Sequence, residues 1–148
     1  MARTIVEPAV DAAQLAAMVE RLFEVLRRLN PRDGLSLTAA STLRRLVRLG
    51  ARRLTELAAA EGVTQPAMTH LVSRLEREGL LRRGGDPADG RVVVVSVTAA
   101  GRAAVRKRRA ARVRALSAVL KDLPPADRAA LAAAAPALDR LAELVADG

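Results

Sequence analysis

The stretch that decides the fold is residues 54–98, which read LTELAAAEGVTQPAMTHLVSRLEREGLLRRGGDPADGRVVVVSVT. Apolar residues recur at helical spacing from residue 55 to 61, and Gly62 follows as a residue that tolerates the left-handed backbone found after a helix. Thr64 can cap a second helix, because its hydroxyl can accept a hydrogen bond from a free amide. Pro66 suits the first turn, where its missing N–H costs nothing. The pattern therefore predicts two helices joined by a tight turn.

The second predicted helix has two chemically different faces. The apolar face, with the i, i+3, i+4, i+7 spacing of a buried stripe, comprises Met68, Leu71, Val72 and Leu75. The opposite face carries Thr69, His70, Ser73, Arg74 and Arg77. No acidic side chain is expected in the middle of that face, so the helix can enter a DNA major groove and meet base edges and phosphates.

Beyond Gly79 the pattern changes from helix to strand and turn. Residues 80–83 and 91–97 read as the two strands of a hairpin, and the second is rich in β-branched valine. Residues 84–90 between them are turn formers, mostly glycine and aspartate. Arginine pairs at 52–53 and 82–83 bracket the region. A two-stranded wing is therefore expected to follow the two helices.

Three segments of this chain, in this order, resemble the winged helix-turn-helix of the MarR (multiple antibiotic resistance regulator) family. They are residues 54–58 (LTELA) leading into 63–69 (VTQPAMT), residues 74–81 (RLEREGLL), and residues 86–91 (DPADGR) followed by 95–101 (VSVTAAG). The resemblance implies a mainly α protein with a small β-hairpin wing, whose winged helix-turn-helix is flanked by N- and C-terminal dimerisation helices. It also implies that Asp89 steadies Arg91 at the wing tip, where the arginine would enter the minor groove.

Four further helices are predicted, over residues 9–29, 37–49, 99–121 and 126–145. The terminal ones have apolar stripes that a small domain cannot cover alone, so we expect them to bury against other helices. Pro136 is expected to bend or divide the last helix. Because such helices of two MarR chains interleave, the resemblance implies three segments. These are an N-terminal helix at 1–35 within a dimerisation domain, a winged helix-turn-helix DNA-binding domain at 36–98, and C-terminal dimerisation helices at 99–148.

Basic residues crowd two of these helices. On the helix at 37–49, the residues expected to face the core are Leu43, Leu46 and Val47, and those expected to face outward are Arg44, Arg45 and Arg48. Residues 102–114 hold seven basic side chains and no acidic one. Three interpretations stay open for this second group: a contact with the DNA backbone, a basic wall for an acidic ligand or partner, and plain solvation.

Composition sets the broad class of the protein. At 148 residues one domain is the default, and the net charge of +9 favours a polyanionic partner, with nucleic acid ahead of an anionic membrane surface. A basic protein with no such partner is the plain alternative. The chain has no cysteine, no bilayer-spanning apolar run and no signal-peptide pattern, so we expect a cytoplasmic protein without disulfides. Its excess of arginine over lysine is compatible with a GC-rich bacterial genome.

The sequence offers little for catalysis or metal binding. His70 is the single histidine, and without cysteine or an adjacent carboxylate it makes neither a zinc site nor a catalytic pair. Asp86 and Asp89 are too few for a calcium cage. We therefore expect no enzyme activity, no metal and no cofactor. Because Phe23 is the only aromatic residue, single-stranded nucleic acid and RNA are less favoured partners than duplex DNA.

We therefore predict a homodimeric MarR-type transcriptional regulator, a repressor rather than an activator, that binds a palindromic operator in double-stranded DNA. The predicted DNA-binding residues are Thr64, Gln65, Pro66, Thr69, His70, Ser73, Arg74, Arg77, Asp89 and Arg91. The resemblance leaves open release by a small anionic or aromatic effector. The alternatives are an architectural DNA binder without sequence preference and a protein-interaction module on the same fold. Polar side chains able to read base edges favour the regulator.

Overall fold

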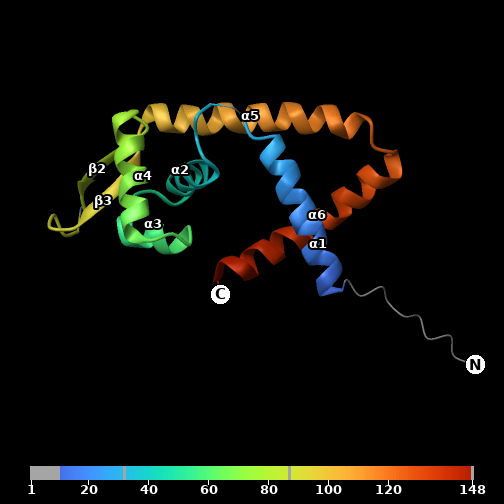
Figure 1. The fold of residues 1–148 in the computed structure, drawn as a ribbon, viewed down its shortest axis with the longest axis horizontal. Helices are drawn as coiled ribbons and strands as arrows, with labels where there is room; N and C mark the ends of the chain where they lie inside the picture. The colour runs from blue at the N-terminus through green and yellow to red at the C-terminus, as the bar shows by residue number, and fades with distance from the viewer. Residues whose placement is uncertain (1–10, 32, 87, 148) are drawn as a thin grey trace, which may run out of the picture. The chain divides into compact units, whose positions relative to one another are not determined.

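The computed structural model describes residues 11–31, 33–86 and 88–147, which form two units, one up to Ala110 and one from Ala111 onward. Its helices are α1 (Ala12–Arg28), α2 (Leu37–Leu49), α3 (Leu54–Ala60), α4 (Gln65–Arg77), α5 (Ala99–Lys121) and α6 (Pro125–Asp147) (Figure 1). Its strands are β1 (Arg52–Arg53), β2 (Leu81–Gly85) and β3 (Val93–Val97). The mainly helical architecture with a small sheet confirms the predicted fold class.

Local signals set the bounds of the two central helices. Gly62 has φ of 62° after the end of α3, and the Val63 N–H donates to the carbonyl of Ala58 at 3.0 Å. The Thr64 hydroxyl oxygen then accepts the Ala67 N–H at 3.4 Å, so α4 begins at the next residue. The predicted helix, tight turn and helix are confirmed, with the capping threonine in its expected place.

The sheet differs from the predicted two-stranded wing. It has three antiparallel strands in the order β1-β3-β2, with Arg52 paired to Val95 and Arg53 to Val94. Two consecutive arginines have no periodicity from which a strand can be read, so β1 could not be predicted. Gly84 and Gly85, expected in the turn, belong to β2, because ladder hydrogen bonds need only backbone groups.

The core of the first unit lies between the helices α2, α3 and α4 and one face of the sheet. Its largest fully buried side chains are Leu43, Leu46, Leu57, Met68, Val72, Leu75, Leu81 and Val95. Leu71 lies at the rim and packs against this cluster. Val47 is 41% exposed, so its predicted core position is wrong. Leu43 and Leu46 form the buried side of α2. Consecutive residues of a helix point about 100° apart, so the residue after Leu46 points away from the core.

The start of α5 is fastened to the turn that follows α4. The Thr98 hydroxyl donates to the carbonyl of Gly79 at 2.6 Å and accepts the Gly101 N–H at 3.0 Å. A side chain at Gly101 would meet the Leu80 carbonyl oxygen at 2.2 Å, so only glycine allows this close approach. Thr98 therefore caps α5, and its two hydrogen bonds place the end of β3 and the turn after α4 side by side.

Arg108 of α5 points inward, in contrast to the basic outer surface expected over residues 102–114. It is 5% exposed, the one charged residue among the described residues that is buried as a whole. Its guanidinium donates to the carboxylate of Asp33, to the side-chain oxygen of Asn30 and, at 3.4 Å, to the carbonyl of Leu35. One arginine thus fastens α5 to the segment that joins α1 to α2.

The second unit consists of the end of α5 and the whole of α6. Helix α6 continues through Pro136, so the predicted division is wrong. Proline has a helical φ and removes one backbone hydrogen bond, which the neighbouring turns tolerate here. The large apolar side chains of α6 are exposed, namely Leu131, Leu138, Leu141, Leu144 and Val145. None of the helices in the described residues is long and apolar enough to cross a membrane.

Replacing Arg108 with alanine should destabilise the fold. The substitution removes hydrogen bonds from a charged donor, which costs about 1–3 kcal/mol of the free energy of unfolding. Arg109→Ala removes the same charge from an exposed neighbour and should change stability by no more than about 0.5 kcal/mol. Urea unfolding at one fixed protein concentration, followed by circular dichroism, measures both. Equal effects of the two substitutions would contradict the anchoring role of Arg108.

Candidate nucleic-acid interface

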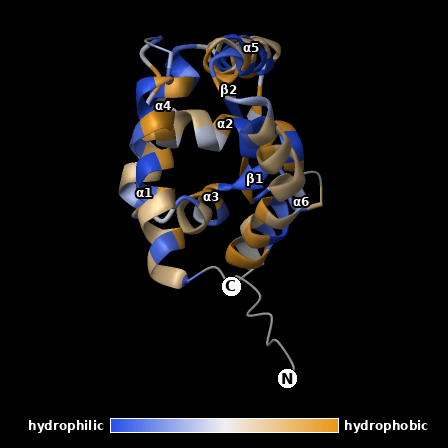
Figure 2. Ribbon diagram, turned by 90° about the vertical axis from the view of Figure 1, so that its right-hand side faces the viewer, coloured by the Kyte–Doolittle hydropathy of each residue, from blue (hydrophilic) through white to orange (hydrophobic). Residues whose placement is uncertain are grey.

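One surface of α4 is free along the first turns of the helix. The predicted site residues that lie exposed on α4 or at its start are Thr64, Gln65, Pro66, Thr69, His70 and Arg77. They lie opposite the buried Met68, Val72 and Leu75. Figure 2 shows that hydrophilic and hydrophobic residues alternate along the helices of this protein. The helical repeat that buries one set therefore presents the other to solvent.

Two of these side chains make bonds within α4 itself. The Thr69 hydroxyl donates to the Gln65 carbonyl at 2.9 Å, which leaves its oxygen able to accept a hydrogen bond. The Arg77 Nε lies 3.4 Å from the Ser73 carbonyl, a long hydrogen bond. Local bonds of this kind restrict the rotamers of both side chains before any partner arrives.

Ser73 and Arg74 were expected on the same free face, but the structure places them half-buried at its edge. The Ser73 Oγ accepts a hydrogen bond of 2.9 Å from Arg83 Nη2. The Arg74 Nε lies 3.8 Å from the carboxylate of Glu78. The C-terminal end of α4 therefore packs beside the first wing strand and carries acidic partners, which the helical repeat alone did not indicate.

The sequence interpretation missed the role of Arg83. Its backbone N–H donates to Glu76 Oε1 at 3.1 Å, and its guanidinium pairs with the same carboxylate. Arg83 lies opposite Val95 in the ladder, so it shares the inner face of the sheet with that buried valine. Arg82 lies on the outer face and donates to Ser96 Oγ at 3.0 Å. Alternation from the buried Leu81 could have distinguished the two arginines.

At the wing tip, Asp89 acts on the backbone. Its carboxylate accepts the Arg91 N–H at 3.0 Å, and within the described residues it makes no ion pair with the exposed Arg91 guanidinium. The expected grip on the guanidinium is thus replaced by a bond that shapes the turn. The Asp86 N–H donates to the Val92 carbonyl at 2.8 Å, and the Asp86 carboxylate lies 3.8 Å from Arg53 Nη2. These contacts fix the base of the tip from which Arg91 projects.

The arginines of α2 are less uniform than expected. Ser41, Arg44, Arg45 and Arg48 line a surface pocket of about 310 Å³. Arg45 is half-buried, because its Nε lies 3.3 Å from the carboxylate of Glu61, which Ser41 Oγ also contacts at 3.1 Å. Arg45 is therefore less exposed than the predicted outward position implied. It fastens α2 to the end of α3, and the outermost cations of this helix are Arg44 and Arg48.

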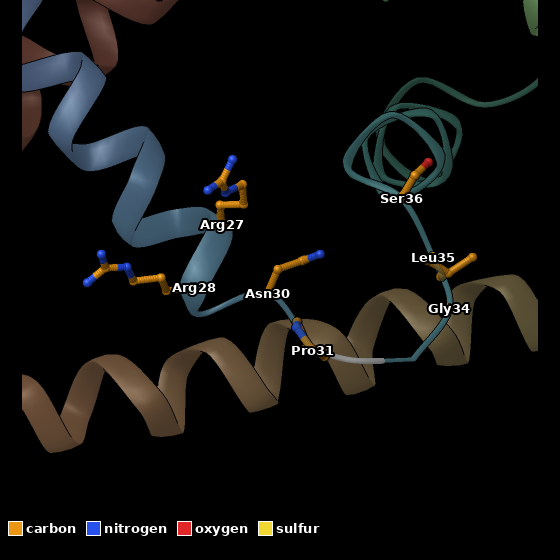
Figure 3. A pocket seen from close by; sticks show the side chains of 7 residues that line it. All are labelled: Arg27, Arg28, Asn30, Pro31, Gly34, Leu35 and Ser36. Atoms are coloured by element: carbon orange, nitrogen blue, oxygen red, sulfur yellow. The ribbon is translucent and has the colours of Figure 1, made fainter.

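A larger open pocket of about 630 Å³ lies where α1 ends and α2 begins. It is lined by Arg27, Arg28, Asn30, Pro31, Gly34, Leu35 and Ser36 (Figure 3). The segment between the two helices crosses this region, and Arg108 bonds its Asn30 and Leu35. The pocket thus has two cations at its rim. Over the described part of the chain there is no group of three or more histidine or acidic residues that could hold a metal ion.

Comparison with known proteins agrees with this arrangement. The model of the MarR family matches residues 35–93. The chain is 37% identical to an uncharacterised HTH-type transcriptional regulator of Mycobacterium bovis over 124 aligned residues. The alignment covers 84% of this chain and 87% of the relative. A solved structure of a candidate transcriptional regulator from Pseudomonas aeruginosa superposes with a TM-score of 0.75 at 36% identity, over 88% of this chain and 92% of its own.

A third protein shares the fold alone. BpsR of Bordetella bronchiseptica is 24% identical, with a TM-score of 0.60 over 90% of this chain and 98% of its own, and 6-hydroxynicotinic acid regulates the DNA binding of that protein. The two more similar proteins carry the family assignment, because they combine higher identity with coverage of most of both chains. This protein belongs to the MarR family of helix-turn-helix transcriptional regulators and is, as predicted, a regulator rather than an enzyme.

Proposed function

We propose that this protein is a homodimeric repressor that binds a palindromic operator through α4 and the wing. The observation that carries the proposal is the exposed face of α4, where Gln65, Thr69 and His70 stand free of acidic partners. Amide, hydroxyl and imidazole groups can read base edges in the major groove, whereas contacts to phosphates carry no sequence information. A helix that displays both kinds of group beside a basic hairpin suits a sequence-specific contact.

The remaining site residues have distinct parts in this proposal. Thr64 and Pro66 shape the first turn of α4 so that it can approach the DNA, and Arg77 contacts a phosphate. Arg91 reaches the minor groove from a turn whose backbone Asp89 shapes. Ser73 and Arg74 support the helix from its half-buried edge. The segments follow the same division: 36–98 for DNA binding, with 1–35 and 99–148 for dimerisation.

A second copy of the chain is the proposed partner of the terminal helices. Helix α1 has no buried residue, and its exposed apolar side chains are Met18, Val19, Leu22, Phe23, Val25 and Leu26. The apolar side chains of α6 are also exposed. Burying such surface contributes about 25 cal/mol per Å², so a chain that leaves it in water gains by association. Two copies would also supply the two α4 helices that a palindrome requires.

A small anionic or aromatic effector that releases the DNA is part of the same proposal. The pocket lined by Arg27 and Arg28 suits an anion, and BpsR, which shares the fold, has its DNA binding regulated by an aromatic acid. Because the proposed target is chromosomal DNA, the protein would act in the cytoplasm. No metal or cofactor is needed for any of these steps.

The two rivals make different demands on α4. An architectural DNA binder without sequence preference needs cations that contact phosphates, and it does not require polar groups on a helix that enters the major groove. A protein-interaction module would present large apolar side chains on its outer face, and within the described residues α4 exposes none. Neither rival accounts for the mixture of Gln65, Thr69 and His70 with Arg77.

The operator should be an inverted repeat. Selection of bound duplexes from a randomised library should recover two half-sites about 10 bp apart, because a two-fold axis relates the reading helices. Affinity for the selected duplex should fall steeply with salt, as expected for roughly 6–10 phosphate contacts. Recovery of no consensus would favour the architectural rival, and an asymmetric single site would contradict the two-fold arrangement.

The mass in solution should be that of a dimer. Light scattering at micromolar concentration is expected to give twice the chain mass of 15.7 kDa. Leu22→Glu places a charge in the exposed apolar stripe of α1 and should shift the protein toward monomer, whereas Glu24→Gln on the same helix should not. A wild-type monomer that still binds an inverted repeat tightly would refute the dimer.

Arg91→Ala should weaken operator binding by about tenfold or more, for a lost contact of about 1–3 kcal/mol. Thermal stability should change little, because Arg91 is exposed and contributes no core contact. Replacing the A·T pairs that flank each half-site with G·C should penalise the wild type more than the variant, since A·T-rich minor grooves are narrow and attract arginine. Competition binding measures all four combinations. Equal flank penalties would place Arg91 outside the groove.

A further inference from the structure

Arg83 belongs to the wing in sequence, but its polar contacts go to α4. Its backbone N–H donates to Glu76 Oε1 at 3.1 Å, its Nη1 pairs with the Glu76 carboxylate, and its Nη2 donates to Ser73 Oγ at 2.9 Å. Ser73 and Glu76 are three residues apart, so they stand on one face of the helix. The planar guanidinium fork meets both acceptors at once, which a lysine could not do.

The backbone of Arg83 is fixed as firmly as its side chain. Arg83 pairs with Val95 of the central strand, and Val95 pairs in turn with Arg52 of β1. Val95 is fully buried, so this row of the sheet is anchored in the core. Beyond Arg83, β2 continues as Gly84 and Gly85, which have no side chains. Arg83 is therefore the last side chain on β2 that can fasten the wing to α4.

We propose that Arg83, with Glu76 and Ser73, is a positioning group that fixes the wing relative to α4, so that both reach DNA as one rigid unit. The inference rests on the proposed function, because it assumes that α4 and the wing tip contact one duplex. The guanidinium points toward α4 and does not contact the DNA. A fixed angle matters because a surface that is ordered before binding loses less entropy when its contacts form.

The link affects geometry more than global stability. The side chains of Arg83 and Glu76 are 30% and 36% exposed, and ion pairs this close to solvent contribute little to folding. The hydrophobic core holds α4 and the sheet in place without them. Substitutions in the link should therefore leave the protein folded, which a melting curve for each variant checks. Their effect should appear in sequence discrimination.

Arg82 supplies a matched control. Arg83→Met and Arg82→Met remove the same charge from adjacent positions of β2, but the side-chain hydrogen bond of Arg82 within the described residues goes to Ser96 on the outer face. The probes are a duplex that the wild type selects from a randomised library and a scrambled duplex of the same length and composition. Arg83→Met should lower affinity for the selected duplex by about tenfold. It should lower affinity for the scrambled duplex by no more than Arg82→Met lowers it. The ratio of the two affinities should fall for Arg83→Met alone.

Glu76→Gln gives a second test, because charge attraction alone and the positioning role predict opposite changes in DNA affinity. It removes a negative charge beside the proposed interface, so electrostatics alone would tighten binding to both duplexes. If Glu76 positions Arg83, binding to the selected duplex weakens and the affinity ratio falls. Arg83→Lys keeps the charge but reaches one acceptor, so it should lie between the wild type and Arg83→Met.

The outcomes separate the two proposals. If Arg83→Met and Arg82→Met lower both affinities by the same factor, or if Glu76→Gln tightens binding to both duplexes, the positioning role is refuted while DNA binding stands. If the wild type selects no duplex, the proposed function itself fails. A drop in the affinity ratio for Arg83→Met and Glu76→Gln, with Arg82→Met unchanged, supports the positioning role.

Discussion

The burial of one face of α4 against the sheet is the constraint on which the rest of the first unit depends. Met68, Val72 and Leu75 are fully buried, and with 3.6 residues per turn they leave one set of side chains to face outward. Gln65 and Thr69 belong to that set. The identity of the exposed face therefore follows from packing, and a substitution that changed this core would reorient the exposed face of α4 along with it.

Prediction from sequence succeeded where a repeated signal spans several residues. The 3.6-residue period placed α2, and the same period together with the capping Thr64 placed α4, almost residue by residue. It failed where position depends on a distant partner. Arg108 is one of seven cations on its stretch of helix, and the carboxylate that selects it lies 75 residues away, at Asp33. Strand β1 likewise forms because its backbone pairs with β3, which is about 40 residues away in the sequence.

The arginines serve two different purposes, which the net charge of +9 does not separate. Arg45, Arg83 and Arg108 are held by Glu61, Glu76 and Asp33, and each joins two segments of the fold. Their fields are largely cancelled by adjacent carboxylates, so they contribute little to attraction at long range. Cations at the wing tip and on the outer faces, such as Arg91, remain to attract a polyanion.

This division bears on how a regulator of this kind would distinguish its operator from other DNA. Phosphate contacts add affinity for every duplex, whereas discrimination depends on side chains that meet base edges at the right angle. In the proposed function the side chains that read bases are few and stand on one helix, so their geometry decides the specificity ratio. Arginines that join helix to strand can then influence specificity without contacting a base. In the proposed function, the arginines that are paired with carboxylates would therefore affect recognition through the orientation of the helix and the wing. Exposed arginines such as Arg91 would affect the affinity for DNA.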